Sequence, residues 1–306
     1  MSIAPLARDF SGTARLGLAL AVASAIGYGT MITATRLSYD AGSNPLTLIC
    51  ARAAVPAAIL ALLMLARGSA FALRPGALWP VAGIALGQLG ITIGYLSAVA
   101  YIPVSLAALV FYAYPVLVAG LLPLTGRGGV GWTTAAAFLA AFAGLALALA
   151  PSFTTLDPLG LTLALGATLS GTLLVLAADR LPPEQDMLPV GLYMNLAALA
   201  VAAPYALLAG GLAAPEGALG WGALAYVCLG FLGAFLAMIG AVRHAGPLRT
   251  ALVFNVEPVV AIASAVLLLG ETLGAGQVLG VALVFAALTL ATLAEQQHVP
   301  VPPPSA

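Results

Sequence analysis

The amino-acid sequence predicts an all-α polytopic membrane protein, with ten transmembrane helices built as an inverted 5+5 repeat. Of its 306 residues, 62% are hydrophobic and only 7% are charged, and the mean hydropathy is +1.12. A soluble domain carries roughly 25% charged residues, so lipid has to cover most of this surface. The other two observations are a series of ten apolar runs and a segment of the first half that recurs in the second.

The ten apolar runs each hold about 20 residues, which as a helix cross roughly 30 Å of hydrocarbon. We expect the first five helices at 15–36, 45–67, 77–99, 101–123 and 130–150, and the second five at 158–178, 187–210, 218–242, 247–269 and 273–294. Turn-forming residues separate them, as in Ser43-Asn44-Pro45 and Leu181-Pro182-Pro183. The Pro-rich tail, 297–306, is expected to be disordered.

The loop arginines predict the orientation. With the N-terminus in the cytoplasm, eight arginines lie in inside segments: Arg8, Arg15, Arg67, Arg74, Arg127, Arg180, Arg243 and Arg249. Only Arg36 lies in an outside loop, and Arg52 lies within a span. This positive-inside bias predicts an integral protein of the plasma (inner) membrane with both termini in the cytoplasm.

A nine-residue segment recurs in the two halves and breaks a helix in each. Residues 108–116 read ALVFYAYPV and residues 251–259 read ALVFNVEPV, with six of the nine positions identical. The two copies lie 143 positions apart in the sequence, a separation that we term the repeat offset. Gly87 and Gly90 recur as Gly230 and Gly233 at the same separation. Since each unit holds an odd number of spans, the second enters the membrane from the opposite side. We therefore predict two related repeats, 11–150 and 154–296.

The proline in each copy points to a class of function for this fold. Proline removes a backbone donor and loosens the helix around it. Paired, interrupted spans at corresponding positions of two halves point to the midplane binding site of a transporter. Such a chain is expected to alternate between outward-facing and inward-facing states, with a small-molecule substrate held between the halves.

The chain resembles the EamA family of the drug/metabolite transporter superfamily, over about residues 15–295. The motifs that carry the resemblance are Asn255-x-Glu257-Pro258-Val259, Leu269-Gly270-Glu271-Thr272-Leu273 and Gln277-x-x-Gly280. The first repeat departs from the family at Thr125-Gly126-Arg127, where a Gly-Glu pair is usual. The resemblance implies ten helices around a central cavity, and efflux of amino acids, other small metabolites or toxic organic compounds.

Glu257 is the foremost candidate for substrate binding. A carboxyl group near the bilayer centre costs a few kcal/mol unless it is protonated, paired or hydrated. It can be a substrate ligand, it can carry a coupling proton, or it can have a structural role beside Pro258. Its neighbour Asn255, and Tyr112 and Tyr114 in the first copy, are candidates for lining the same pocket.

Arg52, in the second span, is the other charge at depth. Its planar guanidinium suits a carboxylate. Three alternatives remain: it pairs with a substrate carboxylate, it pairs with Glu257, or it snorkels to the membrane surface. Tyr28, Gln88 and Tyr95 complete the candidate substrate-binding residues, with ordinary contact between helices as the alternative for each.

Other kinds of function find little support. The two histidines, His244 and His298, do not form an HExxH-type zinc motif, and a chain without lysine has no phosphate-binding Gly-Lys motif. We therefore expect a protein without enzymatic activity, cofactor or nucleic-acid partner. The alternative function is that of a polytopic membrane enzyme or a lipid-handling protein. The partners expected are the lipid bilayer and a small solute. Small-residue GxxxG faces occur at Gly83 and Gly87, Gly90 and Gly94, Gly270 and Gly274, and Gly276 and Gly280. We expect these faces to pack helices within one chain, and a dimer is the alternative.

Overall fold

The computed structural model describes residues 6–125, 131–150, 156–209, 211–270 and 272–297. Within these ranges the regular structure is entirely helical, which confirms the predicted all-α class. Gly126, Arg127, Glu271 and the tail from residue 298 onward lie outside the described residues. The predicted boundary between the repeats adjoins 151–155, which are also outside them, and it stays a prediction.

The helices follow the predicted order. The first half contains α1 (Leu6–Asp40), α2 (Pro45–Arg67), α3 (Leu78–Ala98), α4 (Val104–Phe111), α5 (Tyr114–Leu121), the 3₁₀ turn η1 (Leu122–Thr125) and α6 (Trp132–Leu149). The second half contains α7 (Pro158–Asp179), α8 (Met187–Ala209), α9 (Gly217–Ala245), α10 (Pro247–Val253), α11 (Val256–Leu269) and α12 (Ala275–Gln297).

These helices form ten spans, because α4 continues into α5 and α10 into α11. In the described part of the chain, nine spans are long and apolar enough to cross a membrane. The tenth is a shorter apolar stretch of α12, Ala275–Thr289. The chain is thus a polytopic membrane protein, as predicted.

Both interrupted spans break just before their proline. α4 ends at Phe111 and α5 begins at Tyr114, so Pro115 lies in the first turn of the new helix. α10 ends at Val253, and α11 begins at Val256, two residues before Pro258. Proline fits a first helical turn, where its missing N–H has no partner to lose. At the first break, the Thr168 hydroxyl of α7 donates to the Val110 carbonyl at 2.8 Å.

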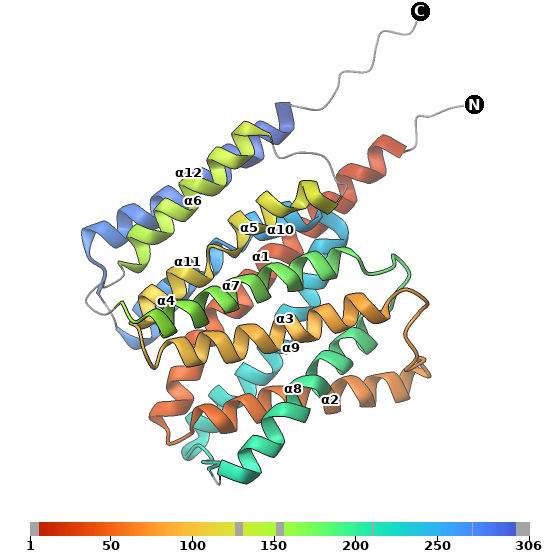
Figure 1. The fold of residues 1–306 in the computed structure, drawn as a ribbon, viewed down its shortest axis with the longest axis vertical. Coiled ribbons are helices and arrows are strands. Elements are labelled where there is room, and N and C mark those ends of the chain that lie inside the picture. The colour runs from red at the N-terminus through yellow and green to blue at the C-terminus, as the bar shows by residue number, and fades with distance from the viewer. Residues whose placement is uncertain (1–5, 126–130, 151–155, 210, 271, 298–306) are drawn as a thin grey trace, which may run out of the picture.

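The two halves interleave, and the pairing of their helices obeys the repeat. The first helix of each half packs along the third helix of the other, α1 on α9 and α7 on α3. Equivalent helices also pair with each other, α2 with α8 and α6 with α12. Figure 1 shows α6 and α12 side by side, and α1 beginning and α12 ending at the same end of the bundle.

Glycine faces bring several of these pairs together within the chain, as expected. A Cβ on Gly87 or Gly94 of α3 would meet backbone atoms of α7. A Cβ on Gly280 of α12 would meet the backbone of α6 at Gly144 and Ala148. By contrast, Gly276 faces open space. The glycines of α3 and Gly280 therefore serve close contact between helices of one chain.

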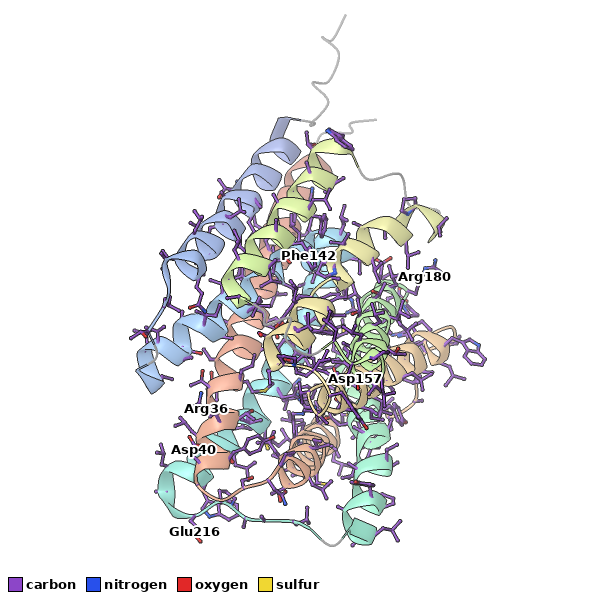
Figure 2. The ribbon with its side chains drawn as sticks, turned by 60° about the vertical axis from the view of Figure 1, so that its left-hand side comes forward. Arg36, Asp40, Phe142, Asp157, Arg180 and Glu216 are labelled. Carbon is purple, nitrogen blue, oxygen red and sulfur yellow. The ribbon has the colours of Figure 1, made fainter. Side chains whose placement is uncertain are left out.

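Hydrogen bonds join connections from different halves at each end of the bundle. At the end where α1 stops, the Glu216 N–H donates to the Ala41 carbonyl at 2.6 Å, and the Asn44 amide donates to the Gly211 carbonyl. Figure 2 shows Arg36, Asp40 and Glu216 at this end. At the opposite end, the Arg74 N–H donates to Gln185 Oε1 at 2.9 Å. Each end is therefore tied across the repeat boundary.

Candidate functional site

A cavity of about 430 Å³ lies between the halves, lined by α1, α2, α3, α7, α9 and both broken spans. It holds seven of the eight residues that the sequence singled out: Tyr28, Arg52, Gln88, Tyr95, Tyr112, Tyr114 and Glu257. From Glu257 the cavity extends to Tyr39 and Val104, at the end of the bundle where α1 stops. The structure thus brings the candidate side chains together in one place.

The lining follows the repeat residue by residue. Seven pairs of lining positions are separated by the repeat offset: Tyr28 and Gly171, Met31 and Leu174, Ile32 and Val175, Gln88 and Phe231, Tyr95 and Met238, Phe111 and Phe254, and Tyr114 and Glu257. Both members of each pair contribute to the same cavity. The cavity therefore lies where the two inverted halves meet, which is where such a repeat places a binding site.

Glu257 lies in the first turn of α11, next to the proline that ends the break. Its carboxyl group lies near the Tyr112 hydroxyl, which can hydrogen-bond with it. The carboxyl group is also close enough to interact electrostatically with Tyr28, Tyr95 and Tyr114. Gly29 lets α1 approach this turn, because a Cβ there would meet the Glu257 carbonyl. The carboxyl group is thus surrounded by tyrosines contributed by three other spans.

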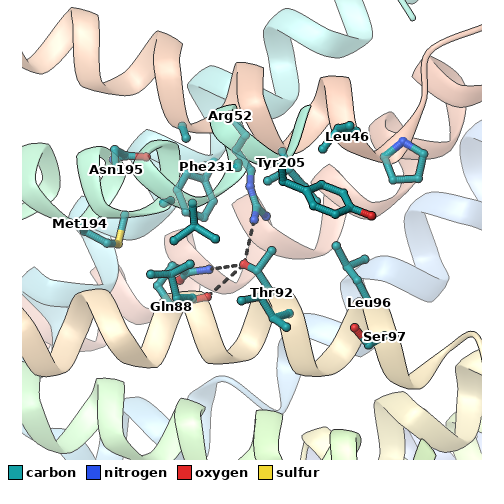
Figure 3. A pocket seen from close by; sticks show the side chains of 18 residues that line it. Leu46, Arg52, Gln88, Thr92, Leu96, Ser97, Met194, Asn195, Tyr205 and Phe231 are labelled. Atoms are coloured by element: carbon teal, nitrogen blue, oxygen red, sulfur yellow. Dashed lines mark hydrogen bonds between the residues drawn. The ribbon is translucent and has the colours of Figure 1, made fainter. Parts of the chain in front are cut away.

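Arg52 projects from α2 into the gap between α2 and α3. Its Nη2 donates to Thr92 Oγ1 at 3.2 Å, and its guanidinium carbon lies 4.5 Å from the centre of the Phe231 ring. Figure 3 shows Arg52 directed at Thr92, with Gln88 beside them. Among the described residues, no acidic side chain forms an ion pair with Arg52. Arg52 and Glu257 therefore form no ion pair in the described part of the chain, and pairing with a substrate carboxylate and snorkelling both stay predictions.

Aromatic rings form much of the remaining wall. Phe111 lies 5.9 Å from Tyr95, 5.2 Å from Tyr112 and 5.3 Å from Tyr114, measured between ring centroids. Tyr28 contacts Phe231 and Phe254 at 6.0 and 6.2 Å. The sequence reasoning missed Phe111 and Phe254, although both are the phenylalanine of the repeated nine-residue segment. It also missed Thr92 and Phe231, which nothing in the pattern distinguished.

Asn255 is placed differently from the other candidates. Its side chain is buried and does not line the cavity. The amide instead donates to the Leu252 carbonyl at 2.9 Å and to the Ala251 carbonyl at 3.4 Å. These carbonyls belong to α10, just before the break. Asn255 therefore satisfies backbone groups of the interrupted span in this conformation.

Comparison with known proteins shows the fold, and a family to which the second half is similar. A solved crystal structure, described only as that of a protein, matches with a TM-score of 0.77. The match covers 93% of this chain and 99% of the other at 20% sequence identity, so it shows the shared fold alone. No curated protein sequence matches the chain. Residues 158–293 match the model of the EamA-like transporter family. The second half of the chain is thus similar to the EamA-like transporters, a family of the drug/metabolite transporter superfamily.

Proposed function

We propose that the protein is a secondary exporter of a small zwitterionic metabolite, an amino acid or a related compound. The observation that carries the proposal is that Arg52 and Glu257 line one cavity without pairing with each other. A guanidinium and a carboxyl group kept apart in an apolar bundle suit a ligand with one charge of each sign. The cavity of about 430 Å³ falls within the range of small-molecule sites, roughly 300–1,000 Å³.

In this proposal the two ends of the substrate meet different walls. The substrate carboxylate binds Arg52, whose planar fork matches it and which Phe231 and Thr92 hold in place. The substrate ammonium group binds Glu257, and the faces of Tyr28 and Tyr114 can add cation–π attraction. The apolar part of the solute then lies against the aromatic wall.

Alternating access follows from which end of the cavity is closed. Hydrogen bonds join the connections at both ends, so the cavity itself assigns the open end: its lining extends to Tyr39 and Val104 and does not include Gln185 at the opposite end. With both termini in the cytoplasm, as the arginine distribution supports, this arrangement is the outward-facing state. The inverted repeat supplies an inward-facing state, in which the halves exchange roles. Export as the direction rests on the family resemblance.

Transport itself is tested with purified protein in liposomes. Preloaded vesicles are assayed for exchange and net movement of a panel of amino acids, decarboxylated amines and neutral metabolites. The proposal expects the zwitterions to move and their singly charged analogues to move poorly. Chemical conversion of a panel compound, without its movement across the membrane, would favour the enzyme alternative.

The orientation is tested with single cysteines introduced at Ser69, Leu156 and Leu212, in a chain without Cys50 and Cys228. A membrane-impermeant maleimide added to intact cells should label Leu156→Cys and Leu212→Cys and leave Ser69→Cys unlabelled. Labelling of Ser69→Cys from outside would reverse the assigned orientation.

A further inference from the structure

A second cavity, of about 510 Å³, lies beside the first and is formed by α2, α3 and α8. Figure 3 shows it from close by, with Tyr205, Leu46 and Leu96 toward one end and Met194 and Asn195 toward the other. The two cavities share one wall, made of Ile49, Arg52, Gln88, Thr92, Leu96 and Phe231. Arg52 therefore borders both spaces.

The rim of this second cavity, which we term the lateral cleft, faces the membrane. Ile93 of α3 is 51% exposed, and Val201 and Tyr205 of α8 are 48% and 64% exposed. All of them lie inside segments long and apolar enough to cross a bilayer, so the medium at the rim is lipid. This side of the cleft is therefore where we expect a molecule from the bilayer to enter.

The lateral cleft is lined mostly by apolar side chains, and its polar residues are Arg52, Gln88, Thr92, Ser97, Asn195 and Tyr205. Leu89, Met194, Ala198 and Ala202 line its body, and Gln88, Thr92 and Asn195 lie near its base. The Asn195 amide is already bonded to the Gly191 carbonyl at 2.8 Å. Arg52 has a hydroxyl and a ring as neighbours but no acidic partner among the described residues. A charge in such surroundings is costly until an anion neutralises it.

We propose that the lateral cleft binds a single-chain amphiphilic anion from the bilayer, with its headgroup on Arg52 and its chain along α3 and α8. The headgroup is a carboxylate or a phosphate, because either accepts two hydrogen bonds from a guanidinium. The chain replaces lipid contacts of Leu89, Ala198 and Val201 with contacts inside the protein. The inference stands on the cleft and its charge, and does not need the proposed transport activity.

The test is a titration followed by native mass spectrometry, using the full chain in an uncharged detergent. Dodecanoate, dodecyl phosphate, dodecanol and acetate are the probes. We expect one molecule of an alkyl anion per chain, dodecanol binding at least tenfold more weakly, and no binding of acetate. Binding of dodecanoate alone would identify a fatty acid as the occupant, and binding of dodecyl phosphate as well would extend this to single-chain alkyl phosphates. Equal affinity for dodecanol and dodecanoate would overturn the proposal.

Variants of α8 locate the bound chain. Ala198→Phe fills the cleft and should lower dodecanoate affinity at least tenfold, whereas Ala200→Phe, at an exposed alanine outside the cleft, should not. If Ala198→Phe does not fold, Val201→Trp replaces it, because a tryptophan at the exposed rim should obstruct the cleft and lower the affinity in the same way. Unchanged dodecanoate affinity in both Ala198→Phe and Val201→Trp would place the anion outside the lateral cleft and refute the lateral site.

Discussion

Tyr114 and Glu257 occupy equivalent positions of the two repeats, and both line the same cavity. Each lies in the first turn of the helix that follows a break, α5 for Tyr114 and α11 for Glu257. The two residues thus share a backbone setting but differ in charge. The second repeat thus contributes a carboxyl group where the first contributes a phenol, and the two residues provide a matched pair for mutagenesis.

Glu257→Gln should weaken substrate binding and exchange together, by about tenfold or more in affinity. The amide keeps the shape and can still hydrogen-bond with Tyr112, but the charge that meets the substrate ammonium group is gone. A tenfold loss corresponds to about 1.4 kcal/mol, the scale of a hydrogen bond to a charged group. Exchange in liposomes at several pH values measures it.

The other roles of Glu257 give different results in the same assay. A coupling proton on Glu257 predicts that Gln abolishes proton-driven accumulation and spares exchange. A structural role predicts lower folded yield with normal transport per folded molecule. Tyr114→Phe is the control and should leave the pH dependence as in the wild type. Unchanged activity of Glu257→Gln at every pH would exclude both functional roles.

Substitutions of Arg52 should reveal which part of the substrate it binds. Lysine keeps the charge but loses the planar fork and the stacking on Phe231, and glutamine loses the charge as well. We expect amino-acid affinity to fall in the order Arg, Lys, Gln, with a loss of about tenfold or more for Gln. Affinity for the decarboxylated amine should not change, and Asn195→Ser, at the equivalent position of the second half, should behave as wild type. An equal loss for acid and amine would remove Arg52 from the carboxylate site.

Gln185→Ala should open the closed end of the cavity. The Gln185 side chain is buried, and its Oε1 accepts a hydrogen bond from the Arg74 N–H at 2.9 Å. Its main-chain carbonyl accepts a second hydrogen bond, from Arg243 Nη2 at 2.7 Å. Loss of the side chain leaves a backbone donor without its partner, a cost of about 1–3 kcal/mol to the closed state. A cysteine at Met238, in the cavity lining, should react faster with a polar maleimide in inside-out vesicles.

Glu184→Ala is the matched control for that experiment. Glu184 is adjacent in sequence and lies 3.9 Å from Arg74, but both side chains are largely exposed. An exposed ion pair contributes little. If Glu184→Ala raised the labelling rate as much as Gln185→Ala, the closure would not depend on the Gln185 hydrogen bonds.

Gly280→Ala should destabilise the fold by about 1–3 kcal/mol, the usual cost of overpacking. Its new methyl group would meet backbone atoms of α6, which cannot move aside as a side chain can. Gly276→Ala, one turn earlier in α12 and facing open space, should leave stability the same or higher. Thermal unfolding in detergent compares the two, and equal midpoints would show that α6 and α12 tolerate a wider separation.

Much of the fold was predictable because it depends on the lengths of the apolar runs and on the spacing of the repeat. Apolar runs give the spans, and the repeat offset predicts that Tyr114 and Glu257 meet at one site. The contacts of Arg52 were not predictable, since Phe231 comes from α9, a helix of the other half of the chain. Asn255 could not be placed either, because its amide turns to carbonyls that become available only where the helix breaks. The role of these residues in substrate binding stays a prediction.

The interleaving of the halves has a consequence for synthesis. α1 enters the membrane first, yet the Ala234 carbonyl that accepts its Ser24 hydroxyl lies 210 residues later, and the Ser264 partner of Thr33 lies 231 residues later. Contacts this distant in sequence form slowly. Until the second half is translated, the Ser24 and Thr33 hydroxyls lack the partners that they have in the folded protein. We therefore expect the first repeat to reach its folded arrangement only after the second half has entered the membrane.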